Sequence, residues 1–106
     1  MPLGLAIDQD RLAELCRRYR VATLELFGSR AAGTARPDSD VDLLVTFQAG
    51  YTPSFLSPNG FMALLRDLEG LLGCRVDLLT RASVEDDPNE YFRSSALRRT
   101  EILYAA

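Results

Sequence analysis

Asp40 and Asp42 stand two positions apart at the start of an apolar run, Val41–Phe47, whose composition is typical of a buried β-strand. Side chains two apart on a strand point to the same face of a sheet, so the two carboxylates would lie side by side. Adjacent carboxylates repel each other and raise each other's pKa unless a cation lies between them. Mg²⁺ favours carboxylate and phosphate oxygens as ligands. The pair therefore predicts a Mg²⁺ site that works with a phosphate-bearing substrate.

Gly28 and Ser29 follow a second apolar run, Val21–Phe27, where a short helix or a tight turn could begin. Glycine lets the backbone approach a ligand closely, and the free N–H groups of a helix start can hold phosphate oxygens together with the serine hydroxyl. Taken alone this pair is a weak signal, because a plain turn is the default explanation. Arg30 follows directly, and two interpretations stay open for it: a phosphate contact or a solvated surface arginine.

Asp77 lies between Val76 and Leu78 in a third apolar run. A carboxylate in such a strand is costly unless it has a partner. If this strand neighbours the one that carries Asp42, a third carboxylate joins the metal site, where it could hold a second ion or take a proton from an attacking hydroxyl. A purely structural role for Asp77 is an equally open alternative.

The elements that must position these residues alternate along the chain. Apolar periodicity and capping residues predict helices over Asp8–Arg20, Gly60–Leu72 and Glu90–Arg99. Strands are expected over Val21–Phe27, Val41–Phe47 and Cys74–Leu79, with a short strand or frayed end over Ile102–Tyr104. Polar or proline-containing loops are expected over Gln48–Asn59 and Arg81–Asn89. This order predicts a single small α/β (α+β) domain over residues 1–106, with a mixed sheet and helices packed mainly on one face.

Composition removes several classes of function. The 106 residues carry a net charge of -3, which argues against a general nucleic-acid binder. The chain contains no histidine and its 12 basic residues are all arginine, which excludes histidine-based triads, Schiff-base lysines and the lysine-dependent P-loop. No run approaches the length of a membrane span, and the N-terminus does not resemble a signal peptide. Cys16 and Cys74 are expected to be buried thiols in a reducing cytoplasm.

The spacing of these residues strengthens the interpretation. Gly28-Ser29, then ten residues, then Asp40-Val41-Asp42 resembles the signature of the polymerase-beta-type nucleotidyltransferases. Here it stands as "FGSRAAGTARPDSDVDLLV", with matching apolar flanks on both sides. The segment "LEGLLGCRVDLLT" resembles the part that carries the third acid in that family, and "ALRRTEILYAA" resembles its usual ending.

The resemblance implies a polymerase-beta-like nucleotidyltransferase fold and a set of roles. Gly28 and Ser29 would bind the triphosphate of ATP, with Arg30 as a further phosphate contact. Asp40 and Asp42 would hold one or two Mg²⁺ ions. Asp77 would complete the metal site and help to deprotonate the acceptor hydroxyl.

The short chain is most similar to the minimal nucleotidyltransferases, which consist of the catalytic domain alone. In that family the usual partner is a HEPN-domain ribonuclease toxin, and the nucleotidyltransferase is the antitoxin, which moves AMP from ATP onto a tyrosine of the toxin. The resemblance thus implies a hetero-oligomer, with no direct nucleic-acid or membrane partner. Two alternatives stay open: an antitoxin that acts by binding alone, and a small-molecule nucleotidyltransferase whose acceptor site lies on another subunit.

Overall fold

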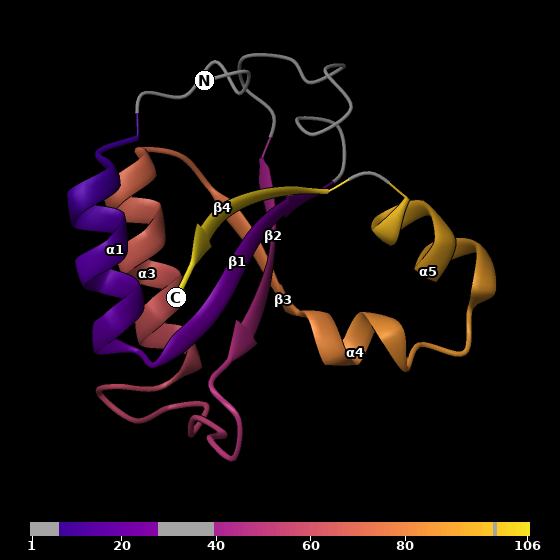
Figure 1. The fold of residues 1–106 in the computed structure, drawn as a ribbon, viewed down its shortest axis with the longest axis horizontal. Helices are drawn as coiled ribbons and strands as arrows, with labels where there is room; N and C mark the ends of the chain where they lie inside the picture. Colours follow the sequence, from indigo (N-terminus) through magenta and orange to yellow (C-terminus); the bar gives the residue numbers. More distant parts are fainter. Residues whose placement is uncertain (1–6, 28–39, 99) are drawn as a thin grey trace.

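The computed structural model describes residues 7–27, 40–98 and 100–106, and a four-stranded mixed sheet lies at its centre (Figure 1). The strand order is β3-β2-β1-β4, with β1 antiparallel to both of its neighbours and β3 parallel to β2. The strands are β1 (Val21–Phe27), β2 (Val41–Phe47), β3 (Val76–Thr80) and β4 (Glu101–Ala105). The helices are α1 (Gln9–Arg18), α3 (Phe61–Leu72), α4 (Arg81–Glu85) and α5 (Glu90–Leu97). The expected small mixed α/β fold is therefore confirmed.

The first helix lies close to its predicted bounds, and β1 and β2 have the predicted bounds. Asp8 caps α1, since its carboxylate accepts hydrogen bonds of 3.1 Å from the backbone N–H groups of Asp10 and Arg11. The helix ends at Arg18, two residues before the predicted end, where Arg20 adopts a φ of 57° and turns the chain into β1. A φ in this left-handed region is incompatible with continuing the helix.

The α3 helix is bounded by two glycines. A side chain at Gly60 would place its Cβ atom 1.9 Å from the carbonyl oxygen of Ser54, so the close approach of these two backbones requires glycine. At the other end Gly73 adopts a left-handed φ of 70° and donates its N–H to the carbonyl of Glu69 at 2.8 Å. The predicted end at Leu72 is therefore confirmed, and the left-handed Gly73 is the reason.

Helices α1 and α3 lie side by side over one face of the sheet, which we call the helix-covered face (Figure 1). Alternate residues of the strands point into this layer, because side chains on a strand alternate between the two faces. The Tyr19 hydroxyl donates a 2.5 Å hydrogen bond to Asp67 and so joins the end of α1 to α3. The buried residues of this core include Leu12, Leu15, Cys16, Leu24, Leu26, Val41, Leu43, Val45, Leu64 and Leu68.

The prediction of a loop over Arg81–Asn89 was wrong for its first part, because residues Arg81–Glu85 form α4. The hydroxyl of Thr80 accepts a 3.2 Å hydrogen bond from the N–H of Ser83 and so caps this helix. Arg81 and Glu85 form an ion pair one turn apart, at 3.3 Å. A helix of five residues is too short to show apolar periodicity, so the pattern in the sequence could not reveal it.

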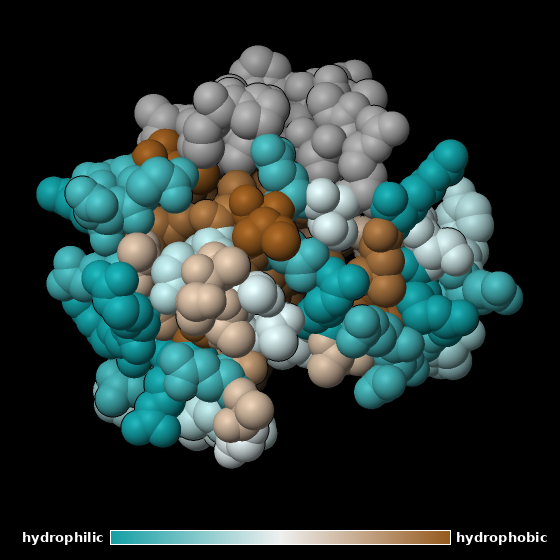
Figure 2. Space-filling model, in the orientation of Figure 1, coloured by the Kyte–Doolittle hydropathy of each residue, from teal (hydrophilic) through white to brown (hydrophobic). Residues whose placement is uncertain are grey.

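Helices α4 and α5 stand beside the opposite face of the sheet, away from α1 and α3 (Figure 1). A second, smaller core joins them to the sheet and consists of Phe27, Leu44, Val84 and Ala96. The hydropathy surface shows polar residues over α1 and over α5, with apolar surface between them over β4 (Figure 2). Ile102 of β4 is 62% exposed. Across the described ranges, no helix combines the length and the apolar character that crossing a membrane requires.

Candidate active site

Asp42 and Asp77 face each other across two neighbouring strands. The parallel ladder between β2 and β3 pairs the two residues directly, as it pairs Leu44 with Leu79 two residues further on. Paired residues in a ladder project from the same face, so both carboxylates lie on the face opposite to the helix-covered one. We call this the carboxylate face. The structure therefore meets the condition under which Asp77 could share a site with Asp42.

The immediate surroundings of Asp42 disfavour its charged form. Its pKa is raised, first because burial removes water from the carboxylate and then because the negative charges of Asp77 and Asp40 repel it. Asp42 is half-buried, whereas Asp40 and Asp77 are exposed and accessible to a ligand from solvent. Such a group of like charges is an arrangement that a bound cation would relieve.

The donor set suits a hard divalent cation, because carboxylate oxygens are the ligands that Mg²⁺ prefers. Asp42 and Asp77 would provide the first two ligands, and Asp40, directly before β2, stands close enough to influence Asp42 electrostatically. Within residues 7–27, 40–98 and 100–106, however, no three acidic or cysteine side chains are gathered tightly enough to enclose an ion together. Phosphate oxygens of a substrate are the natural source of the remaining ligands.

The predicted phosphate-binding residues Gly28, Ser29 and Arg30 lie outside the described residues, as does the short helix or turn expected to begin there. The described chain does fix where this segment starts, because Phe27 is the last residue of β1 and pairs directly with Asp42. The chain therefore enters the predicted phosphate-binding segment beside the acidic pair.

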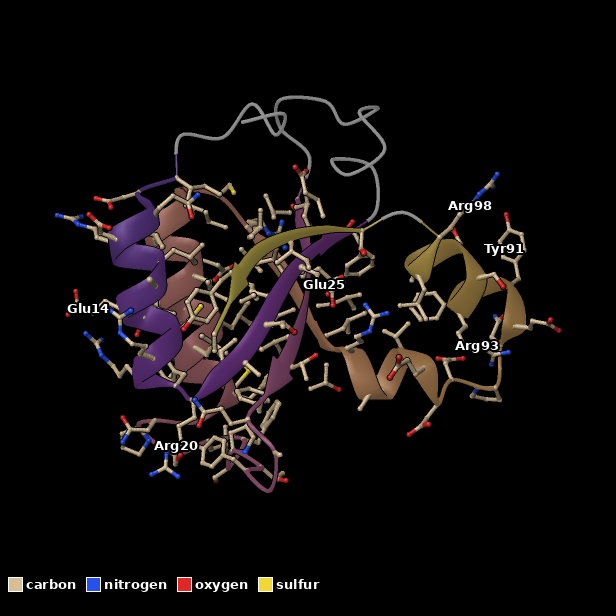
Figure 3. All side chains as sticks on the ribbon, viewed as in Figure 1. Glu14, Arg20, Glu25, Tyr91, Arg93 and Arg98 are labelled. Atoms are coloured by element: carbon tan, nitrogen blue, oxygen red, sulfur yellow. The ribbon has the colours of Figure 1, made fainter. Side chains whose placement is uncertain are left out.

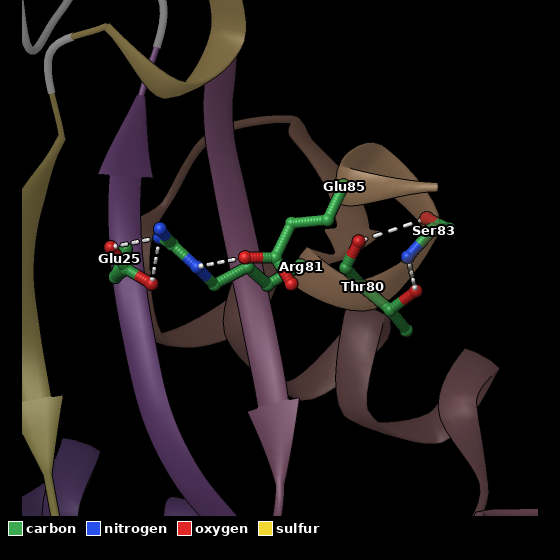
Figure 4. Close-up of polar contacts among 5 residues, drawn as sticks. All are labelled: Glu25, Thr80, Arg81, Ser83 and Glu85. Carbon is green, nitrogen blue, oxygen red and sulfur yellow. Dashed lines mark hydrogen bonds and ion pairs between the residues drawn. The ribbon is translucent and has the colours of Figure 1, made fainter. Parts of the chain in front are cut away.

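A further charged group on the carboxylate face was missed by the sequence interpretation (Figure 3). Glu25 belongs to β1, is only 7% exposed, and pairs with Leu44 of β2. Its two carboxylate oxygens accept hydrogen bonds of 2.8 and 2.7 Å from Nη1 of Arg81 (Figure 4). The hydrogen bond from this guanidinium to Glu25 is the first cause of the raised pKa of Arg81. The sequence did contain a signal for Glu25, since it is a charged residue between the apolar Leu24 and Leu26. Asp42 and Asp77 stand in apolar runs in the same way.

The loop Gln48–Asn59 lies at the other end of β2 from Asp42. Five residue steps separate Asp42 from Phe47, which corresponds to about 17 Å along a strand. The loop helps to line a pocket of about 390 Å³, together with Thr46 and Thr80. This pocket is therefore separate from the carboxylate pair.

Comparison with known proteins identifies the family of this chain. Residues 11–103 match the nucleotidyltransferase domain family. The chain is 44% identical over 72 residues to the protein adenylyltransferase MntA of Thermococcus cleftensis, an alignment that covers 68% of each chain.

Solved structures share the fold. One, of a protein assigned as a minimal nucleotidyltransferase, is 37% identical, with a TM-score of 0.61 over 87% of this chain and 85% of the other. A toxin–antitoxin crystal structure with AMP-PNP has a TM-score of 0.64 and 22% identity, over 94% of this chain and 75% of the other. At that identity the match speaks for the fold alone. The chain belongs to the nucleotidyltransferase domain family, because the family match covers nearly its whole length. Its 44% identity to MntA shows that its relatives include protein adenylyltransferases.

Proposed function

We propose that this protein is a Mg²⁺-dependent adenylyltransferase that acts as an antitoxin, transferring AMP from ATP to a tyrosine hydroxyl of a cognate HEPN-domain toxin in the cytoplasm. The observation that carries the proposal is the direct pairing of Asp42 with Asp77 on an accessible face of the sheet. Two carboxylates in that position suit a metal–nucleotide complex better than they suit a stable fold, because their mutual repulsion is unrelieved without a cation.

In the proposed reaction the acceptor oxygen attacks the α-phosphorus of ATP, a new P–O bond forms, and the bond to the pyrophosphate leaving group breaks. Asp40, Asp42 and Asp77 would hold the cation, which when bound would offset the negative charge that develops on the phosphates. Asp77 is the more exposed member of the paired carboxylates and is accessible to an incoming hydroxyl, so we assign to it the acceptance of the hydroxyl proton.

The remaining nucleotide contacts are proposed to come from Gly28, Ser29 and Arg30. Their support is their position: they follow Phe27, the residue that pairs with Asp42. Backbone N–H groups and a serine hydroxyl there would bind the triphosphate while the carboxylates bind its cation. The preference for ATP rests on the relatives, since MntA of Thermococcus cleftensis is a protein adenylyltransferase and the toxin–antitoxin neighbour was solved with an ATP analogue.

The acceptor is proposed to belong to another protein. Solved structures of similar fold are toxin–antitoxin complexes, which include MntA with HepT. The carboxylate face, where Asp77 and Asp40 are exposed, gives a partner protein access to the reacting group.

The test is transfer of label from α-labelled ATP to the toxin encoded next to this protein, with Mg²⁺ present. We expect label on a tyrosine of the toxin, with release of pyrophosphate, and loss of both when Asp42→Asn is used. Inhibition of the toxin without any label would show an antitoxin that acts by binding alone. Label on a small molecule instead would show that the acceptor is not a protein.

A further inference from the structure

Glu25 and Arg81 form a charged bridge across the strand that carries Asp42. Glu25 lies on β1 and Arg81 begins α4 directly after β3, and β2 separates these two strands in the sheet. Their hydrogen bonds of 2.7 and 2.8 Å therefore pass over β2 on the carboxylate face (Figure 4). They cross beside Leu44, which pairs with Glu25 and lies two residues from Asp42. That separation is about 7 Å along the strand.

The strand that carries Asp77 is held by the packing of Val76 and Leu78 in the core and by a 3.1 Å hydrogen bond from the Val76 N–H to the Glu69 carboxylate of α3. β3 lies at the edge of the described sheet, and β2 is its one neighbouring strand there. The ladder that holds β3 to β2 is also the place where Asp77 opposes Asp42, so their repulsion acts against the pairing. The Glu69 hydrogen bond acts at the start of β3, whereas the bridge from Arg81 to Glu25 connects the end of β3 to the central strand β1.

Stability alone does not explain a charged pair at this position. Glu25 is 7% exposed while the Arg81 side chain is 32% exposed, and removing the carboxylate from water costs about as much as its attraction to the guanidinium returns. Apolar side chains of similar volume often replace such pairs without loss of stability. What the charged pair adds is a fixed orientation of the Arg81 side chain. The planar guanidinium also donates from Nε to Glu85 at 3.3 Å and is therefore held between the two acids.

From this geometry we propose that Glu25 and Arg81 are positioning residues, which hold the edge strand β3 so that Asp77 stays at the spacing from Asp42 that a shared divalent cation requires. This inference rests on the proposed metal site and adds to it two residues that do not touch the ion. Groups that orient metal ligands in this way commonly change metal affinity by about 10- to 100-fold when they are removed.

The experiment measures the affinity of the intact chain for Mn²⁺, as a paramagnetic substitute for Mg²⁺, in the presence of a non-hydrolysable ATP analogue. Because the analogue itself binds Mn²⁺, electron paramagnetic resonance of free Mn²⁺ is compared with and without protein at the same analogue concentration, and the difference reports binding to the protein without any need for transfer activity. The central variant is the double substitution Glu25→Leu with Arg81→Met, which replaces the bridge by apolar contact. We expect its melting temperature to stay near that of the native chain and its Mn²⁺ affinity to fall by about tenfold.

Two controls separate the possible failures. Asp67→Asn also replaces a carboxylate that accepts a side-chain hydrogen bond, but it does so at the helix-covered face, and it should leave Mn²⁺ affinity unchanged. Asp42→Asn should abolish binding, and continued binding would overturn the metal site itself. A folded double variant with native affinity, alongside a non-binding Asp42→Asn, would overturn the positioning role alone.

If the double variant does not fold, Arg81→Lys decides the question. It keeps the positive charge but loses the planar group that lies between Glu25 and Glu85. We expect a folded protein whose Mn²⁺ affinity is weaker than that of the native chain by a few-fold. No other single substitution in the bridge should retain even this partial affinity. Native affinity in Arg81→Lys would contradict the proposal.

Discussion

The two faces of the central sheet have opposite characters. On the helix-covered face, strand residues such as Leu43 and Val45 are fully buried beneath α1 and α3. On the carboxylate face, the same strand presents Asp42, whose charge is disfavoured by burial and by two neighbouring acids. One strand thus contributes Leu43 and Val45 to the larger core on one face, and on the other face it carries the destabilising charge of Asp42 two residues before the buried Leu44. The comparison indicates that the proposed reacting groups lie on one face alone, whereas the larger core lies on the other.

The largest effect is expected on the carboxylate face. Asp42→Asn should reduce AMP transfer by at least about 100-fold, because the lost charge is needed for binding of the cation and for electrostatic stabilisation of the transferred group. The same variant should not destabilise the protein. A raised folded-state pKa means that the charged carboxylate opposes folding above that pKa, and that this cost is relieved as the pH falls through it.

An amide removes the charge at every pH, so Asp42→Asn should melt at the same temperature as the native chain or higher when no metal is present. Calorimetry and the transfer assay together check this prediction. A large drop in melting temperature would show that Asp42 stabilises the fold and would contradict the division between the faces.

On the helix-covered face the effect should be reversed. Leu68→Ala removes a fully buried side chain of α3, at an expected cost of about 2–5 kcal/mol. For a domain of this size that corresponds to a fall in melting temperature of at least roughly 10 °C. Leu56→Ala is the matched control, because Leu56 is 81% exposed and the same change there should cost no more than about 0.5 kcal/mol. Equal losses in the two variants would contradict the assignment of the core.

A smaller effect is expected at alkaline pH. Burial raises the pKa of Cys16 from 9.0 to about 12, and burial with the Asp67 hydrogen bond raises that of Tyr19 from 10.0 to about 12. The unfolded chain therefore loses these protons at lower pH than the folded chain does. Their contribution to stability is complete below the unfolded values and is lost as the pH rises from about 9 to 12.

The midpoint of urea unfolding, measured at several pH values, should fall over this interval. Tyr19→Phe removes the Tyr19 titration and should make the fall shallower. A midpoint that stays constant to pH 12 would show that neither group is held in its neutral form by the helix-covered face.

The smallest effect separates the two cysteines. Cys16 lies fully buried between α1 and the sheet, whereas Cys74 is half-buried, and neither forms a disulfide. Iodoacetamide should alkylate Cys74 first, with Cys16 at least about tenfold slower, because reaction requires an accessible thiolate. In denaturant the two rates should converge. Mass spectrometry of peptides after a short exposure checks the order, and faster labelling of Cys16 would show that its core opens readily.

Most elements were predictable from local patterns. The bounds of β1 and β2 follow from apolar runs with clear ends, and the end of α3 follows from Gly73. The α4 helix was not predictable, because its evidence is a cap and one ion pair within five residues. The Glu25–Arg81 bridge was also missed, since 56 positions separate its members and only the fold places them together. The roles of Gly28, Ser29 and Arg30 stay predictions.

The sequence by itself determined which residues could do chemistry. Asp42 and Asp77 are conspicuous because charge in an apolar run needs a partner, and that reasoning depends on residue type and neighbours alone. Only the tertiary structure decided that β3 lies parallel to β2 with the two aspartates in register, and that Arg81 reaches across to Glu25. The physical reason is that pairing between distant strands is selected by packing of the whole sheet against its helices, and no local pattern encodes that choice.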